Sequence, residues 1–545
     1  MQDELRNAAE AWLTQDPDPQ TRAELQVLVE SDDDELIDCF SGRLQFGTAG
    51  LRGKLGPGPN RMNRVVVLQA AAGLANYLKQ HHPHEASIVI GYDARHNSDV
   101  FARDTAAIMQ GAGINALVLP KPLPTPVLAY AIKHLGTSAG VMVTASHNPP
   151  QDNGYKVYLD DGCQIVPPAD ADIAREIEHV AITMNVQDIP TNDEWVTLGE
   201  DILEAYIARA VSLVTAEQRI DNEHLTTVIT PMHGVGGSTL HRVLELAGFP
   251  APIRVTEQFE PDPDFPTVAF PNPEEPGAMD LSLAAAAEHR PDIVIANDPD
   301  ADRCAIAIPT TDGYRMLTGD EVGSLLGWWA TKQNSKRTTL AQSIVSGTML
   351  TSIAESAGLD YEHTLTGFKW IGRIPTLRFG YEEALGYCVD PEAVSDKDGI
   401  TAALAVATLA AQLKANRQTL QDKLDDLAID HGVHATRQVS IRVADLAHIS
   451  EVMETLRNHP PASIGGLDVT RFVDLAIGAN LPPTDGLLFE LASNARVIIR
   501  PSGTEPKVKA YLQAVVPVVT ELTDAQQEAD ARLTELDAAV RVWLN

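Results

Sequence analysis

Short apolar runs alternate with amphipathic stretches along most of the chain. Runs such as 87–92 (SIVIGY) and 227–230 (TVIT) are strand-like, and a helical pattern follows each of them. In the stretch that starts at Leu240, apolar residues at i, i+3, i+4 and i+7 share one helical face, and Gly248 supplies a stop. This alternation predicts βαβ units with buried, mainly parallel or mixed sheets.

The composition is that of a large soluble enzyme with several domains. The chain has 545 residues, of which 44% are hydrophobic and 21% are charged, and this length predicts about three to four domains. The formal net charge of −34 argues against nucleic acid or an anionic membrane as a partner, because both need a positive surface. Neither kind of partner is therefore expected, and the oligomeric state stays open.

Cysteine usage and the N-terminal pattern predict a cytoplasmic location. The four cysteines are scattered and form no CxxC pair, so neither a zinc site nor a disulfide framework is indicated. The sequence has no apolar stretch long enough to cross a bilayer, and its first residues are acidic and amphipathic rather than signal-like.

The first chemical cluster is GVMVTASHNPP, in which an apolar run breaks off at Thr144. Ser146 then follows the end of a predicted strand, where ligands of such sheets bind, so it is a candidate nucleophile. His147 is the candidate base. A serine in an ordinary turn, with a histidine that orients the loop, is the competing interpretation.

The second cluster is IVIANDPDADR, in which Asp298, Asp300 and Asp302 alternate directly after a strand-like run. In an extended loop their carboxylates can converge, and they would repel one another without a cation among them. Hard oxygen ligands suit Mg²⁺, which keeps positions free for phosphate oxygens. Arg303 would add a positive charge for a phosphoryl group. A solvated acidic turn is the competing interpretation.

Two further clusters could bind a sugar phosphate. The segment RPSGTEPKVK concentrates Arg500, Lys507 and Lys509 with two hydroxyls and a glycine, as a dianionic phosphate requires. In GYEEALGY, Glu382 and Glu383 could accept hydrogen bonds from sugar hydroxyls. A glycosidase with paired carboxylates would use the same two residues. A helix start with surface glutamates explains that second segment equally well.

Together and in this order, the clusters resemble the α-D-phosphohexomutase superfamily, which includes phosphoglucomutases and phosphomannomutases. FGTAGLRG resembles its N-terminal substrate loop, TASHNP its phosphoserine loop, DPDADR its metal loop, GYEEALG its sugar-recognition loop and RPSGTEP its phosphate-binding loop. The wording of EEALGY, TGFKWIG and PPQDNGYKVY is most similar to the branch with phosphopentomutases and long bacterial phosphoglucomutases.

The resemblance implies a fold, an activity and site residues. The fold would comprise four domains around a central cleft: α/β/α domains at 1–210, 211–320 and 321–430, and a smaller α+β domain at 431–545. The activity would be that of an isomerase that moves a phosphoryl group between sugar positions 1 and 6 through a phosphoserine, with one Mg²⁺ and a sugar 1,6-bisphosphate intermediate or activator.

The resemblance also implies roles for individual residues. Ser146 would be phosphorylated. The metal ligands would be Ser146, through its phosphoryl group, with Asp298, Asp300 and Asp302. The other catalytic residues would be Arg52, Arg303 and Lys156, with Lys156 as a proton shuttle. The substrate-binding residues would be Thr366, Gly367, Glu382, Lys397, Arg500, Ser502, Gly503 and Thr504.

The sequence departs from the family pattern at one position. Many members carry serine two positions after the sugar-reading glutamate, where this chain has Ala384. One hydroxyl contact to the sugar is therefore lost or supplied elsewhere, and glucose, mannose and pentose phosphates all stay open as substrates.

Two other functions also stay open. The segment around Asp298 resembles the start of haloacid-dehalogenase-type phosphotransferases, which form an aspartyl phosphate, although Asp302 stands where that pattern expects threonine or valine. A non-catalytic sugar-phosphate sensor would keep the same binding loops.

Overall fold

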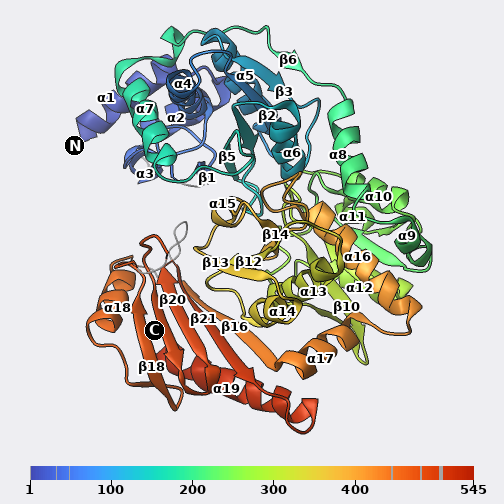
Figure 1. Ribbon diagram of the computed structural model, residues 1–545. Helices are drawn as coiled ribbons and strands as arrows, with labels where there is room; N and C mark the ends of the chain where they lie inside the picture. The colour runs from blue at the N-terminus through green and yellow to red at the C-terminus, as the bar shows by residue number, and fades with distance from the viewer. Residues whose placement is uncertain are drawn as a thin grey trace. The chain divides into compact units, whose positions relative to one another are not determined.

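The computed structural model describes residues 2–31, 34–47, 50–442, 446–478, 481–501 and 507–544, and Figure 1 shows its helices and strands. The chain divides into two compact units. One comprises Met1–Met316 and Gly386–Gln412, and the other comprises Leu317–Leu385 and Leu413–Asn545.

The first sheet of the first unit is mixed, in the order β1-β5-β4-β2-β3-β6. Strand β2 is parallel to β3 and β4, whereas β5 is antiparallel to both β4 and β1. The strands are β1 (Leu51–Lys54), β2 (Ser87–Tyr92), β3 (Asn115–Val118), β4 (Ala139–Val143), β5 (Asp152–Leu159) and β6 (Val196–Thr197). All five residues of β4 are buried, as its apolar sequence predicts for a central strand.

Helices lie before and between the strands of this sheet along the chain. They are α1 (Gln2–Gln15), α2 (Pro19–Ser31), α3 (Asp34–Phe40), α4 (Arg64–His81), α5 (Ser98–Gly111), α6 (Thr125–Leu135) and α7 (Ala169–Thr183), with a 3-10 turn at Val186–Asp188. Helix α4 packs against α5 and α7, whereas α6 packs against β2 and β4 (Figure 1). A Cβ on Gly140 of β4 would lie 2.4 Å from Cδ1 of Ile132, so only glycine lets α6 approach this closely.

The second sheet of the first unit has the order β11-β10-β9-β7-β8. Strand β7 is parallel to β8 and β9, and β10 is antiparallel to β9 and β11. The strands are β7 (Thr227–Thr230), β8 (Ile253–Arg254), β9 (Ile293–Ala296), β10 (Ala305–Thr310) and β11 (Gly313–Met316). The helices are α8 (Asp201–Val211), α9 (Ala216–Asn222), α10 (Gly237–Leu246), α11 (Thr256–Phe259) and α12 (Asp280–His289). Strand β15 (Gly386–Cys388) and most of α16 (Gly399–Ala415) also belong to this unit.

The second unit contains a parallel set of strands and an antiparallel sheet. Strand β12 (Thr339–Ser343) runs parallel to β13 (Asp360–Thr364) and β14 (Leu377–Glu382). Helix α13 packs against β14, and α14 packs against β12 and β13. The helices are α13 (Gly319–Lys332), α14 (Met349–Ala357), α15 (Phe368–Ile371) and α17 (Leu420–His431).

The antiparallel sheet follows with the order β16-β21-β20-β19-β18-β17. Its strands are β16 (Val433–Arg442), β17 (Ser463–Ile464), β18 (Leu467–Asp474), β19 (Leu487–Leu491), β20 (Arg496–Pro501) and β21 (Lys507–Val516), with a 3-10 turn at Ala492–Asn494. Helices α18 (Leu446–Asn458) and α19 (Leu522–Leu544) lie against this sheet (Figure 1). Their apolar residues share one core with the sheet. The predicted fold class, three mixed α/β/α domains followed by an α+β domain, is confirmed.

The segment GYEEALGY is not a helix start. Strand β14 ends at Glu382, a turn follows in which Leu385 has φ 62°, and β15 begins at Gly386. The helix-start interpretation was wrong because the apolar residues before the glutamates form a buried strand, which spacing alone does not distinguish from a helix. Within the described ranges, no helix combines the length and apolarity that crossing a membrane requires.

A half-buried histidine of the second unit, His434, predicts acid sensitivity. His434 Nδ1 lies 2.9 Å from Thr348 Oγ1, and Gln513 Nε2 donates to that hydroxyl at 2.7 Å. Burial lowers the pKa of His434 to about 4, from an ordinary value of 6.5. As the pH falls, His434 takes up a proton in the unfolded chain before it does so in the folded protein. Its contribution to the free energy of unfolding is therefore fully present above about pH 6.5 and is lost as the pH approaches 4, by up to about 3 kcal/mol. Thermal unfolding between pH 7 and about pH 4.5 should show this loss.

The matched variants are His434→Gln and His459→Gln, since His459 is an exposed histidine of the same unit. His434→Gln should flatten the pH dependence of the unfolding temperature, and His459→Gln should leave it as in the parent protein. Equal pH dependence in the two variants would show that His434 does not cause the loss.

Candidate active site

Ser146 lies in a sharply turned loop after β4. Ser146 is 2% exposed and has φ 53°, a left-handed conformation that costs a non-glycine residue about 1–3 kcal/mol. Its backbone N–H donates to Thr144 Oγ1 at 2.9 Å, and the Thr144 hydroxyl donates to Asp93 Oδ2 at 2.6 Å. These bonds hold a conformation that turns the serine out of the strand direction.

Three carboxylates gather beside this serine. Asp298, Asp300 and Asp302 follow β9, are at most 1% exposed, and offer oxygen atoms that all lie within 4.8 Å of one another. The Ser146 hydroxyl donates to Asp298 Oδ2 at 2.8 Å. The structure therefore brings together the serine and the aspartates that the sequence singled out, although they lie far apart along the chain.

The carboxylate cluster fits a divalent cation. Asp300 Oδ1 and Asp302 Oδ1 are buried, and no residue that the structure describes donates a hydrogen bond to either oxygen. Burial, together with the negative charges of Asp300 and Asp302, raises the pKa of Asp298 well above its usual value. Buried oxygens without donors, and mutual repulsion, are what a bound cation would relieve, and three carboxylates suit a hard ion.

Two lysines partly neutralise the cluster. Lys156 Nζ on β5 donates to Asp300 Oδ2 at 2.7 Å and to Asp302 Oδ2 at 3.0 Å. Lys397 Nζ, which the resemblance assigns to the sugar, donates to Asp302 Oδ2 at 2.7 Å. Burial alone would lower the pKa of Lys156, but the two carboxylates raise it above its usual value. Both side chains are thus held as cations at the cluster.

The predicted arginines also lie near the serine. Arg52 Nη1 on β1 donates to Asn148 Oδ1 at 3.2 Å, in the loop that carries Ser146. Arg303 Nε lies 3.8 Å from Asp302 Oδ1 and 4.0 Å from Asp298 Oδ2. Both guanidinium groups can therefore serve a phosphoryl group on Ser146.

Close backbone packing positions Arg52. A Cβ on Gly50, which has φ +78°, would lie 1.9 Å from the carbonyl oxygen of Tyr155. Only glycine therefore allows the segment before Arg52 to run along β5.

His147 is neutral at neutral pH. Its Nδ1 lies 3.2 Å from Ser146 Oγ. Burial, with the positive charges of Arg303 and Arg52, lowers the pKa of His147 well below its usual value. The imidazole can therefore exchange a proton with the serine oxygen without carrying a charge at rest.

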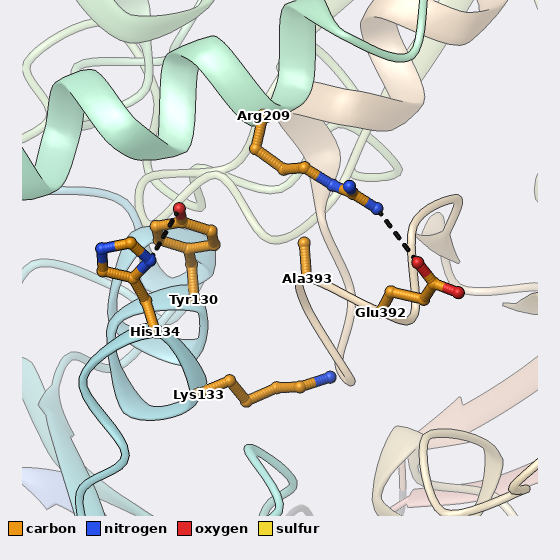
Figure 2. Close-up of a pocket in the computed structure, with 6 residues that line it drawn as sticks. All are labelled: Tyr130, Lys133, His134, Arg209, Glu392 and Ala393. Carbon is orange, nitrogen blue, oxygen red and sulfur yellow. Dashed lines mark hydrogen bonds and ion pairs between the residues drawn. The ribbon is translucent and has the colours of Figure 1, made fainter.

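The segment before Lys397 is held by hydrogen bonds from residues that do not belong to the carboxylate cluster. Arg209 Nε donates to Asp390 Oδ2 at 2.6 Å, and Lys133 Nζ donates to the Pro391 carbonyl and to Ser395 Oγ, both at 2.9 Å. These contacts border a hollow of about 310 Å³, which Figure 2 shows. It is lined by Tyr130, Lys133, His134, Arg209, Glu392 and Ala393. None of the predicted site residues lines it, so its contacts serve to hold the segment.

The second unit brings other predicted residues together. Gly367 N–H donates to Glu382 Oε1 at 2.6 Å, and Arg500 donates to Thr366 Oγ1. Glu383, by contrast, accepts hydrogen bonds from two serines of its own unit. Ser502, Gly503 and Thr504 lie outside the described residues.

Family models match the chain in four consecutive parts. They are the phosphoglucomutase/phosphomannomutase alpha/beta/alpha domains I at 43–183, II at 204–312 and III at 318–429, and the C-terminal domain at 439–531. The chain belongs to the phosphoglucomutase/phosphomannomutase family. The predicted superfamily is thus confirmed, and so is the predicted enzyme class, a phosphomutase.

Relatives and a solved structure agree with this assignment. The phosphomutase is 51% identical over 485 residues to a probable phosphomannomutase of Haemophilus influenzae, covering 88% of this chain and 97% of the relative. It is 35% identical over 567 residues to human phosphopentomutase, covering 93% and 90%. The crystal structure of Paramecium parafusin, a phosphoglucomutase in an open form, shares the fold with a TM-score of 0.71. That structure is 19% identical, and the match covers 92% of this chain and 95% of the other.

Two residues of the phosphomutase that contact the site, Thr125 and Arg95, belong to none of the clusters that the sequence marks. Thr125, at the start of α6, donates through its hydroxyl to Asp300 Oδ2 at 2.6 Å and through its N–H to the Asp300 carbonyl at 2.9 Å. Arg95 donates to the Ser146 carbonyl at 2.7 Å. Both contacts join distant segments, and only a turn after an apolar run marks either residue in the sequence.

Proposed function

We propose that this phosphomutase interconverts hexose 1-phosphates and 6-phosphates, of glucose and/or mannose, through a phosphoserine at Ser146 and a sugar 1,6-bisphosphate. The observation that carries the proposal is the 2.8 Å contact between Ser146 Oγ and Asp298 Oδ2, inside a buried cluster of carboxylates. A phosphoryl group on this oxygen would lie against the cation site.

One Mg²⁺ per site would be held by Asp298, Asp300 and Asp302 together with an oxygen of the phosphorylated Ser146. When bound, it supplies neutralising charge to the phosphoryl oxygens. Phosphoryl transfer depends mainly on positioning and charge stabilisation, so Arg52 would share this task from its place beside the Ser146 loop.

In the first half-reaction, the bond between Ser146 Oγ and phosphorus breaks and a bond from phosphorus to the free sugar hydroxyl forms. The hydroxyl loses a proton and the serine oxygen gains one. In the second, the phosphoryl group from the other end of the bisphosphate returns to Ser146.

Protons balance over the two half-reactions. In the second, the serine hydroxyl can pass its proton to Asp298 Oδ2 at 2.8 Å or to His147 Nδ1 at 3.2 Å. The departing sugar oxygen needs a proton, and the Lys156 ammonium is assigned to supply it. In the first half-reaction the same groups act in the opposite direction.

The non-reacting phosphate and the sugar hydroxyls are assigned to the second unit. Arg500 donates a hydrogen bond to Thr366 there, and Glu382 accepts a hydrogen bond from the N–H of Gly367. Ser502, Gly503 and Thr504 complete the assigned phosphate loop. Lys397 is assigned to the substrate by resemblance, and its contact with Asp302 would first have to loosen.

A pentose phosphate is the second candidate substrate. The match to human phosphopentomutase covers 93% of this chain, and Ala384 lacks the hydroxyl that many members of the family carry at this position. A ribose or deoxyribose 1-phosphate would then be converted to the 5-phosphate by the same two half-reactions.

A coupled assay with Mg²⁺ and a trace of glucose 1,6-bisphosphate tests the proposal. Glucose, mannose and ribose 1-phosphates are compared by kcat/KM. The better hexose phosphate is expected to exceed ribose 1-phosphate at least about tenfold. A ribose 1-phosphate value above both hexose phosphates would establish the pentose reaction instead, and no turnover of any of the three would refute the phosphomutase proposal.

A further inference from the structure

Arg95 donates several hydrogen bonds to the backbone of the loop that carries Ser146. It follows the end of β2, is 4% exposed, and is separated from the loop by about fifty residues of chain. Its Nη2 donates to the carbonyls of Ser146, at 2.7 Å, and Asn148. Its Nη1 donates to the carbonyls of Pro149, at 2.8 Å, and Asp152, at 3.1 Å. One guanidinium thus binds three carbonyls of the loop after β4 and the carbonyl of the first residue of β5.

Two contacts fix the guanidinium itself. Its Nε lies 3.5 Å from Asp93 Oδ2, and its central carbon lies 4.8 Å from the centre of the Phe265 ring. The ion pair is fully buried, with both side chains 1% exposed. The planar fork of arginine suits this geometry, whereas the ammonium of lysine has no fixed plane.

Asp93 links the guanidinium to the serine by a second route. It accepts a hydrogen bond from the Thr144 hydroxyl, which in turn accepts the N–H of Ser146. Both backbone polar groups of Ser146, its N–H and its C=O, are therefore set by the Asp93–Arg95 pair. This matters because Ser146 has φ 53°, a conformation that a non-glycine residue keeps only where its surroundings impose it.

We propose that Arg95 is a positioning residue that holds the Ser146 loop in its left-handed turn and so aims Ser146 Oγ at the aspartate cluster. The inference rests on the proposed function of Ser146, and it assigns Arg95 no contact with substrate. A loosened loop would let the serine oxygen drift from the line of phosphoryl transfer, where a misplacement of about 1 Å can reduce the rate about a hundredfold.

The test replaces Arg95 with lysine and uses Arg64→Lys as the matched control. Arg64 makes two 2.7 Å contacts with Asp104 in the same unit, away from the site, so the control removes a comparable bidentate arginine. Arg95→Lys is expected to lower kcat about 10- to 100-fold and to change KM by less than about twofold, because Arg95 is assigned no contact with the substrate. Arg64→Lys should keep the parent kcat.

A second measurement distinguishes a loosened Ser146 loop from a general loss of stability. Amide hydrogen exchange in residues 144–152 should quicken in Arg95→Lys and not in Arg64→Lys, with Mg²⁺ present. If Arg95→Lys does not fold, Phe265→Leu replaces it, since this change removes only the aromatic face and leaves the buried charges paired. It should lower kcat about threefold at unchanged KM.

The outcomes are distinct. A parent-like kcat and loop exchange in Arg95→Lys, or in Phe265→Leu where that variant is used, overturns the role of Arg95 while leaving the proposed function intact. A parent protein that turns over substrate without ever carrying phosphate on Ser146 refutes the proposed function itself, and the positioning role with it.

Discussion

Ser146→Ala is expected to lower kcat about 10³-fold or more in the Mg²⁺-dependent mutase assay. The serine oxygen is the only atom of that side chain that can form a phosphate ester, and it already donates to Asp298 Oδ2 at 2.8 Å. Alanine keeps the Cβ and therefore the packing of the buried turn. The parent protein, incubated with glucose 1,6-bisphosphate, should gain the mass of one phosphoryl group, and the variant should not.

Ser138→Ala is the matched control. Ser138 directly precedes β4, whereas Ser146 follows it, and the Ser138 hydroxyl accepts the N–H of Ser87 at 3.3 Å. The control therefore removes the same kind of atom next to the other end of the same strand. This control should keep the parent kcat and take up phosphate normally. Turnover at the parent rate in Ser146→Ala would remove the serine from the mechanism.

The chemistry of the bound phosphate also separates serine from aspartate as nucleophile. Hydroxylamine cleaves an acyl phosphate and leaves a phosphoserine intact, so the phosphorylated parent protein should resist it. Phosphate lost to hydroxylamine, together with phosphorylation of Ser146→Ala, would instead assign the ester to Asp298 and support the haloacid-dehalogenase-type alternative.

The strand ends could be predicted from the sequence because they obey a local rule. Apolar runs of strand length mark β4 and β9, and ligands of such sheets bind beyond the carboxyl ends of strands. Ser146 and Asp298 each stand a few residues past such an end. Their convergence followed from the family resemblance, since periodicity does not say which sheets face one another.

The contacts of Lys397 could not be predicted in the same way. Its ammonium reaches Asp302 because the backbone approaches closely on either side. A Cβ on Gly386 would lie 2.4 Å from Lys397 Cδ, and a Cβ on Gly399 would lie 2.2 Å from the Arg303 carbonyl oxygen. In a single sequence such glycines look like ordinary turn residues. The same holds for Arg95, whose four acceptors are backbone carbonyls and have no side-chain pattern.

Asp298→Asn is expected to abolish the response of the protein to Mg²⁺. In the parent protein, Mg²⁺ at about 100 times its Kd should raise the free energy of unfolding by about 2.7 kcal/mol, as binding to the folded state alone requires. Asparagine has nearly the same shape but lacks the charge, so affinity for the cation should fall steeply and kcat should fall about 10³-fold. Thermal unfolding and turnover, each measured with Mg²⁺ and with EDTA, check this.

In EDTA, where no cation is bound, Asp298→Asn is expected not to destabilise the protein. Burial, with the charges of Asp300 and Asp302, raises the pKa of Asp298, so the ionised side chain is unfavourable when no cation is bound. Removing its charge should therefore leave the unfolding temperature in EDTA unchanged or higher, whereas loss of an ordinary buried contact would lower it. Asp312→Asn, in the exposed turn between β10 and β11, is the matched control and should behave as the parent protein does in both buffers. A variant at Asp298 that keeps both the Mg²⁺-dependent shift and the parent kcat would place the cation away from this cluster.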